Sequence, residues 1–248
     1  MLHSSYPEKG EVIPLTYEIL NNPGLGVVLT IGAYMLAMKL YTNVRWPILN
    51  ANIIGSIMLI MLLDFSGLPY EFYKEGGKYI AFLLELTMIA LAVPIYKNLH
   101  LIKKNASAIF LGILCGAVVG IISSYIFSLV FGANGVIAVS IAPKSVTTPI
   151  SKGICTISGG VPAVTHATAV ASGIVGMTIG PFFLRIIGVK HPIAQGLALG
   201  TGSHGLGTSR AVEEGEIEGA ISSLAMGIAG IITSLAMPFF LKLIKHIH

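Results

Sequence analysis

Two polar stretches of the sequence carry the side chains best suited to binding a small anion. The first, "APKSVTTPIS" at 142–151, places a lysine and three hydroxyl residues between two prolines. The second, "GTGSHGLGTSR" at 200–210, combines four glycines with hydroxyls, a histidine and an arginine. A cation can pair with a carboxylate, while hydroxyls and free backbone amides can donate hydrogen bonds to its oxygens.

In the first stretch, Lys144 is the candidate countercharge, and Ser145, Thr147 and Thr148 are the candidate hydroxyl donors. Both prolines disfavour a continuous helix here, because each lacks a backbone donor and crowds the preceding turn. The alternative interpretation is an ordinary turn outside the membrane with a basic anchor. The apolar sequence on both sides favours a binding role.

In the second stretch, Arg210 could clamp a carboxylate with two parallel hydrogen bonds, and His204 could accept a coupling proton near neutral pH. The alternative is a solvated ladder of Arg210 with the glutamates that follow it, which are Glu213, Glu214, Glu216 and Glu218. The candidate binding residues of this stretch are Gly200, Thr201, Gly202, Ser203, His204, Gly205, Thr208 and Arg210.

Glu85 is a second candidate for proton coupling, beside His204. It lies seven positions into the apolar stretch that starts at residue 79. A carboxylate at that depth is costly unless it is protonated, paired or in contact with water. The alternative is a structural acid that is hydrogen-bonded to a neighbouring helix.

The composition requires that these side chains be positioned by membrane helices. Of the 248 residues, 54% are hydrophobic and only 10% are charged, and the mean hydropathy is +0.83. A spanning helix needs about 20 residues, so the chain has room for about seven or eight spans. We therefore expect an all-α integral membrane protein, with 1–248 forming one transmembrane domain after a short polar tail at 1–22.

The apolar stretches predict the spans, and the two polar stretches predict two broken helices. Bare backbone at membrane depth is tolerated only where protein encloses it or where it lines a cavity. We therefore expect the two breaks to meet in the interior and to direct free amides towards an anion. The apolar stretches are 24–41, 48–63, 79–97, 105–131, 162–187, 192–200 and 217–241.

The two halves of the chain also resemble each other. "TIG" at 30–32 recurs at 178–180, and "LAVPIYKNL" at 91–99 matches "LAMPFFLKL" at 235–243. "PILN" at 47–50 matches "PIAQ" in the same order and at a similar separation. These matches predict that 24–97 and 172–242 are repeat units, with inverted topology as in many transporters.

Several function classes find no support in the sequence. It contains no nucleophile elbow, no zinc-protease motif, no cysteine pair at metal spacing and no phosphate-binding loop. We therefore expect no enzymatic activity, no metal and no cofactor. The net charge of +4 is small and spread over loop ends, which fits lipid headgroups better than nucleic acid.

The motifs resemble those of the LrgB/CidB family of bacterial membrane proteins, from about residue 20 to the end. The similarity is carried by "LALGTGSHGLGTSRAVEEGEIEGAISSLAMGIAGIITSLAMP", together with "IAPKSVTTPIS" and "ALAVPIYKNL". It covers Lys144, Ser145, Thr147, Thr148 and the run 200–210. The chain departs from the family pattern at Glu85 and Leu86, where the family has a Gly-Pro pair.

The resemblance implies a multi-pass protein of the cell membrane that carries small monocarboxylates such as pyruvate, glycolate or glycerate. It also implies a link to the control of murein hydrolase activity and autolysis. The expected partners are a small organic anion, the lipid bilayer, further copies of the chain, and a smaller holin-like protein of the LrgA/CidA type. The alternative is a holin- or antiholin-type oligomer that regulates murein hydrolase export without carrying a solute.

Overall fold

The structure is a computed structural model that describes residues 22–44, 51–67 and 70–247. Within these residues the regular structure is entirely helical, as the sequence predicts. The chain forms two compact units, 1–89 and 90–248, and each is described separately below. The predicted polar tail, apart from Asn22, lies outside the described residues.

The first unit contains α2 (Pro23–Val44), α3 (Ala51–Ser66) and most of α4 (Tyr70–Ala90). Helices α2 and α3 pack against each other. Helix α4 crosses α2 at a pair of glycines, where a Cβ placed on Gly76 would lie 2.6 Å from Gly26 Cα. Only glycine allows so close a crossing.

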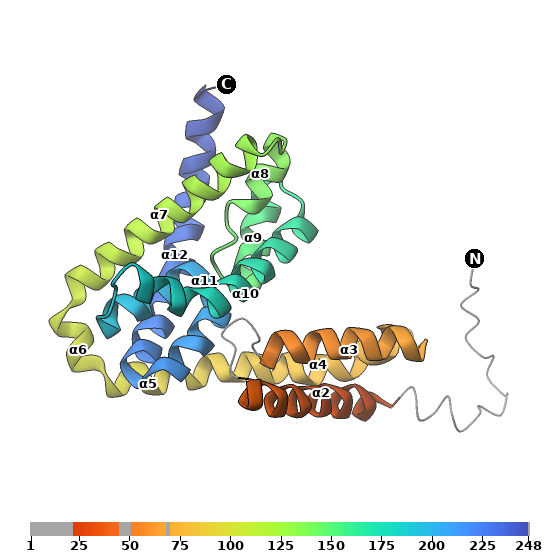
Figure 1. Cartoon of the computed structure of the whole chain (residues 1–248). Helices are drawn as coiled ribbons and strands as arrows, with labels where there is room; N and C mark the ends of the chain where they lie inside the picture. Colours follow the sequence, from red (N-terminus) through yellow and green to blue (C-terminus); the bar gives the residue numbers. More distant parts are fainter. Residues whose placement is uncertain (1–21, 45–50, 68–69, 248) are drawn as a thin grey trace. The chain divides into compact units, whose positions relative to one another are not determined.

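The second unit is built around α12, which packs against α11, α7, α5 and α9, while α10 covers α11 (Figure 1). Helix α11 makes its most extensive contact with α12. The helices of this unit are α5 (Ala92–Lys97), α6 (Leu99–Lys104), α7 (Ala106–Val130), α8 (Gly135–Ile141), α9 (Thr148–Ser158), α10 (Pro162–Ile186), α11 (Pro192–Glu214) and α12 (Glu216–Ile247).

Four segments of the described chain are long and apolar enough to cross a membrane. Helix α3 adds a shorter apolar segment, Ile53–Ser66. The predicted count of seven or eight spans and the inverted repeat stay predictions, and so does the single domain; the repeat match at 47–50 lies outside the described residues. The four segments are Pro23–Thr42, Ala106–Val130, Pro162–Ile186 and Glu216–Ile244.

The apolar stretch predicted at 79–97 is divided between two helices. Helix α4 ends at Ala90 and α5 begins at Ala92. Pro94 lies four residues after Ala90 and has no N–H to donate to the Ala90 carbonyl, so the helix is interrupted there. The sequence contains this proline, but its effect on the span was not predicted.

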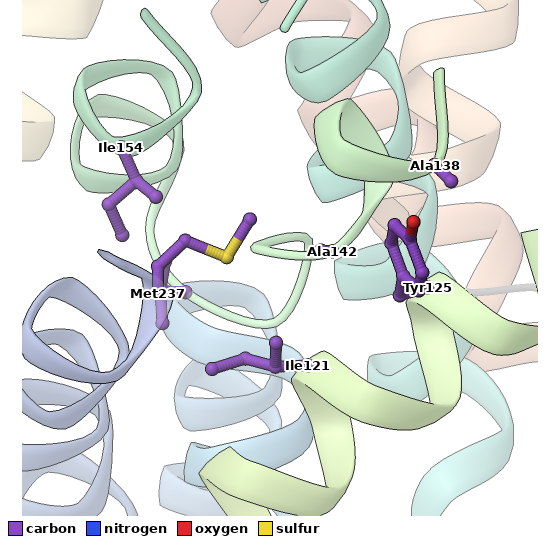
Figure 2. Packing of buried hydrophobic residues seen from close by; sticks show 7 residues of the cluster. Ile121, Tyr125, Ala138, Ala142, Ile154 and Met237 are labelled. Atoms are coloured by element: carbon purple, nitrogen blue, oxygen red, sulfur yellow. The ribbon is translucent and has the colours of Figure 1, made fainter. Parts of the chain in front are cut away.

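A buried apolar cluster holds the turn between α8 and α9 in place (Figure 2). Ala142 and Val146 of the turn are buried in it together with Met237 of α12. Tyr125 of α7 packs edge-on against Phe240, with ring centroids 5.2 Å apart. The apolar residues of the turn thus anchor it, while its polar residues at 144 and 145 stay half-buried.

Candidate functional site

The first predicted break is present as the turn at 142–147, between α8 and α9. Within this turn the Lys144 amide donates to the Ile141 carbonyl over 3.0 Å. Helix α9 then begins at Thr148, with Thr147 as its N-cap and Pro149 in its first turn. The Thr147 side chain makes no capping hydrogen bond. Because the first amides of a helix have no partner within it, this end favours negative charge.

The second predicted break is present inside α11. Ser203 (φ −136°, ψ 16°) and His204 (φ 42°, ψ −132°) leave helical geometry and divide α11 into two half-helices. Among the described non-glycine residues, only His204 has a positive φ. Such a conformation is strained for a side chain other than glycine, and strain of this kind persists where the surroundings enforce it.

A hydrogen bond to α10 holds the His204 ring. His204 Nε2 lies 2.9 Å from the Ala169 carbonyl oxygen, and only 5% of the residue is exposed. A carbonyl can only accept, so Nε2 carries the proton in this contact. The His204 carbonyl in turn accepts from Thr208 Oγ1 over 2.8 Å, and Thr208 Oγ1 lies 3.0 Å from Ser222 Oγ of α12. Hydrogen bonds to α10 on one side and to α12 on the other therefore hold the second break in place.

The two breaks meet through a chain of polar contacts that we call the Lys144–Ser172–Gly202 link. Lys144 Nζ lies 3.5 Å from Ser172 Oγ of α10, and Ser172 Oγ lies 3.5 Å from the Gly202 carbonyl oxygen. Lys144 Nζ also lies 3.4 Å from Ser145 Oγ. All three distances are long for hydrogen bonds, so these contacts are weak.

Glycines of α7 bring both breaks onto one face of that helix. A Cβ placed on Gly116 would lie 2.8 Å from Thr201 Cγ2, and one placed on Gly120 would lie 3.5 Å from Ser145 Oγ. Residues four apart lie on the same face of a helix. The first break therefore packs one turn away from the second.

Two glycines of α10 pack against the second break. A Cβ placed on Gly173 would lie 2.8 Å from His204 Cε1, and one on Gly176 would overlap the Ser203 side chain. The sequence predicts the glycines within the breaks, but their glycine partners on α7 and α10 were not predicted. The recurrence of small residues along both helices was the sequence signal that could have indicated these close contacts.

Arg210 is paired with two of the glutamates that follow it, as in the alternative interpretation of the second stretch. Arg210 pairs with Glu213 over 2.7 Å and with Glu214 over 2.5 Å, and Glu214 also pairs with Arg185 over 2.5 Å. A substrate carboxylate would have to displace one of these partners. In the part of the chain that the structure describes, no Asp or Glu lies within salt-bridge distance of Lys144.

The other predicted site residues differ in how deeply they are buried around the two breaks. Thr201 is buried, and its Oγ1 has no hydrogen-bond partner within the described chain. Gly200 packs against the α12 backbone, whereas Gly202 faces open space and Gly205 has only Met226 Sδ nearby, at 3.9 Å. Thr147 and Thr148 are half-buried where α9 begins.

Glu85 lies in α4, but its side chain is outside the part of the chain that the structure describes. Its predicted role in proton coupling therefore stays a prediction. Among the described residues, no group of three or more His, Cys, Asp or Glu side chains could hold a metal ion.

A cavity of about 440 Å³ beside Lys144 was not predicted from the sequence. It is more open than enclosed, and it combines three serines of α7 with apolar residues. The sequence signal was the spacing of Ser124 and Ser128, four residues apart, in an otherwise apolar stretch. The lining residues are Ser123, Ser124, Phe127, Ser128, Phe131, Ala133, Ile141 and Lys144.

Comparison with known proteins places this arrangement in a family. Residues 30–243 match the model of the LrgB-like family. The chain belongs to the LrgB-like family. The match includes both breaks, the glycine faces of α7 and α10, and Lys144.

Several bacterial relatives match over most of their length. The protein YxaC of Bacillus subtilis (strain 168) is 38% identical over 212 residues, which cover 86% of this chain and 92% of YxaC. Antiholin-like protein LrgB of Bacillus mycoides (strain KBAB4) is 33% identical over 223 residues, covering 90% of this chain and 97% of that protein. No solved structure matches. With its apolar helices, this LrgB-like chain is a multi-pass protein of the cell membrane.

Proposed function

We propose that this LrgB-like protein is a carrier of small monocarboxylates, with Lys144 as the group that binds the carboxylate. The observation that carries the proposal is the position of Lys144. It lies half-buried at the meeting point of the two breaks, next to hydroxyls and with no carboxylate partner among the described residues. A cation in such surroundings gains most from an anionic ligand.

The backbone around Lys144 supports the same ligand charge. The first turn of α9 supplies amides without helical partners, and Thr148 provides a hydroxyl at that end. Thr201 Oγ1 is buried without a partner at the second break, so it can donate to a bound oxygen. These groups would hold the carboxylate without a second cation, and Arg210 would maintain the end of α11 through its paired glutamates.

In this proposal His204 couples transport to a proton. Its ring touches the α10 backbone at the same level as the Lys144–Ser172–Gly202 link. A proton on the second ring nitrogen would add positive charge beside the anion site and favour its occupation. Glu85 remains the other candidate for this role.

Transport by purified protein in proteoliposomes tests the carrier proposal. We expect labelled glycolate or pyruvate uptake that saturates with concentration and is accelerated by unlabelled acid on the other side. Lys144→Met should abolish this uptake. Lys152→Met removes an exposed lysine of α9 outside the breaks and serves as the matched control. Uptake that does not depend on Lys144 would refute the proposal.

The names of the relatives favour a second candidate function. Several LrgB relatives are called antiholin-like, which supports a role in regulating murein hydrolase activity together with a holin-like membrane partner. An assembly of that kind would conduct solutes without saturation or act only through its partner. Saturable counterflow by the purified chain alone would distinguish the carrier from such an assembly.

A further inference from the structure

Four exposed lysines lie near the point where α6 ends and α11 begins. Lys97 is in the last turn of α5, and Lys103 and Lys104 are in the last turn of α6, which leads into α7 (Figure 1). Lys190 lies two residues before α11. All four residues are exposed. We call this group of four lysines the basic corner.

The packing of α7 against α11 brings the lysines of both segments to the same level. A Cβ placed on Gly112 would lie 3.3 Å from Leu197 Cδ1, and one placed on Gly116 would lie 2.8 Å from Thr201 Cγ2. These contacts advance by four residues on each helix, so α7 and the first half of α11 run in the same direction. Because Lys190 lies two residues before α11 and the last lysine of α6 lies two residues before α7, both lie at the same end of this helix pair.

Side-chain hydrogen bonds fix the backbone that carries these lysines. Asn105 Nδ2, directly after α6, donates to the Leu101 carbonyl over 2.9 Å. Gln195 Nε2 donates to the Val189 carbonyl over 2.8 Å, next to the lysine that precedes α11. Ile102 of α6 is buried in an apolar cluster against which the first turn of α11 packs. The basic corner therefore presents its charges from ordered backbone.

No carboxylate neutralises the basic corner. Among the residues that the structure describes, none of its lysines lies within salt-bridge distance of an Asp or Glu. Helix α12 packs against α5, yet its Glu216 and Glu218 form no ion pair with these lysines. Tyr96 and Leu99, which are 79% and 37% exposed, add apolar surface on α5 and α6. The corner thus combines unpaired positive charge with exposed apolar side chains.

We propose that the basic corner binds the phosphate headgroup of an anionic phospholipid. Helix α7 is long and apolar enough to cross a membrane, so lysines just before it lie at the level of the headgroups. Lysines from two segments can contact one phosphate there. The acyl chains of a lipid can contact Tyr96 and Leu99, whereas a free phosphate gains nothing from these side chains.

The expected effect of each lysine follows from its charge. A lysine near a membrane surface strengthens binding to anionic lipid by about fivefold. Lys104→Gln and Lys190→Gln should therefore each weaken binding about fivefold, although the two residues belong to segments far apart in the sequence. Lys104→Arg keeps the charge and should keep the affinity.

Thermal unfolding of the purified full chain in a non-ionic detergent tests this proposal. The protein is titrated with dioleoylphosphatidylglycerol, with dioleoylphosphatidylcholine and with inorganic phosphate. The two lipids have the same acyl chains and differ in net charge. We expect only the anionic lipid to raise the unfolding midpoint, and we expect both glutamine variants to require more of it. Lys152→Gln, which removes an exposed lysine of α9 outside the corner, is the matched control.

The outcomes are distinct from those that test the carrier proposal, because the titrations contain no monocarboxylate. An effect of the anionic lipid that weakens in Lys104→Gln and Lys190→Gln, but not in Lys152→Gln, supports the lipid site. Equal stabilisation by the two lipids overturns it. So does an effect of the anionic lipid that is unchanged in both corner variants or equally weakened in the control. Equal stabilisation by inorganic phosphate would indicate a site for free anions and would also overturn the proposal.

Discussion

The packing of the second break predicts opposite effects for alanine at two glycines only two residues apart. A Cβ placed on Gly200 would lie 2.8 Å from Ser222 Cα and overlap the Ser222 carbonyl of α12. A Cβ placed on Gly202 meets nothing within 4 Å. Gly200→Ala should therefore force α11 away from α12, whereas Gly202→Ala requires no adjustment.

The magnitude follows from two terms. Overpacking against a backbone that cannot rotate away costs about 1–3 kcal/mol. Alanine in place of a helical glycine stabilises by about 0.5–1 kcal/mol. Both variants gain the same stabilisation from alanine. The difference between their unfolding free energies therefore measures only the cost of the overlap at residue 200. We expect Gly202→Ala to be neutral or stabilising and Gly200→Ala to be less stable than it by about 1–3 kcal/mol.

Thermal unfolding in detergent measures this difference. For a chain of this size about 1 kcal/mol corresponds to about 2–4 °C, so the two midpoints should differ by several degrees. The wild-type midpoint should lie between them. If both variants shifted in the same direction by the same amount, the packing of α11 on α12 described above would be refuted.

Two further predictions concern the strained histidine and the charged cluster. His204→Gly relieves about 1–3 kcal/mol of backbone strain, but it loses a hydrogen bond worth about 0.5–1.5 kcal/mol and leaves a cavity in place of the buried ring. Stability should therefore fall by about 1–3 kcal/mol, and pH-dependent uptake should be lost. Uptake with unchanged pH dependence would contradict this role. Glu214→Gln should destabilise by about 1–3 kcal/mol, because its side chain is 13% exposed and pairs with two arginines. Glu213→Gln, at 55% exposed, should change stability by less than about 1 kcal/mol, and equal effects in urea-induced unfolding would argue against the cluster.

The two breaks at 142–147 and 203–204 could be predicted from the sequence because they depend on nearby residues, whereas the interruption at Pro94 was missed. Pro143 and Pro149 disfavour a continuous helix at the first break. The glycine run of the second stretch weakens the helix enough for His204 to leave helical geometry. The all-helical fold could be predicted from the composition, because apolar stretches of this length form helices in lipid.

The partners of the site could not be predicted, because they come from distant elements. Neither the contact of Lys144 with Ser172 nor that of His204 with Ala169 leaves a local pattern. The sequence allowed two roles for Arg210, and only the positions of Glu213 and Glu214 in the structure distinguish a paired arginine from a free one. Such pairings depend on tertiary packing.

The proposed carrier function depends on the binding of a carboxylate by Lys144 where the two breaks meet. Its most direct test is the ligand-induced thermal shift of the purified protein with glycolate, glycerate, lactate and pyruvate, repeated with Lys144→Ala. We predict that at least one acid raises the unfolding midpoint in proportion to the logarithm of its concentration, and that the shift vanishes in the variant. An equal shift in Lys144→Ala, or no shift with any of the four acids, would contradict carboxylate binding by Lys144.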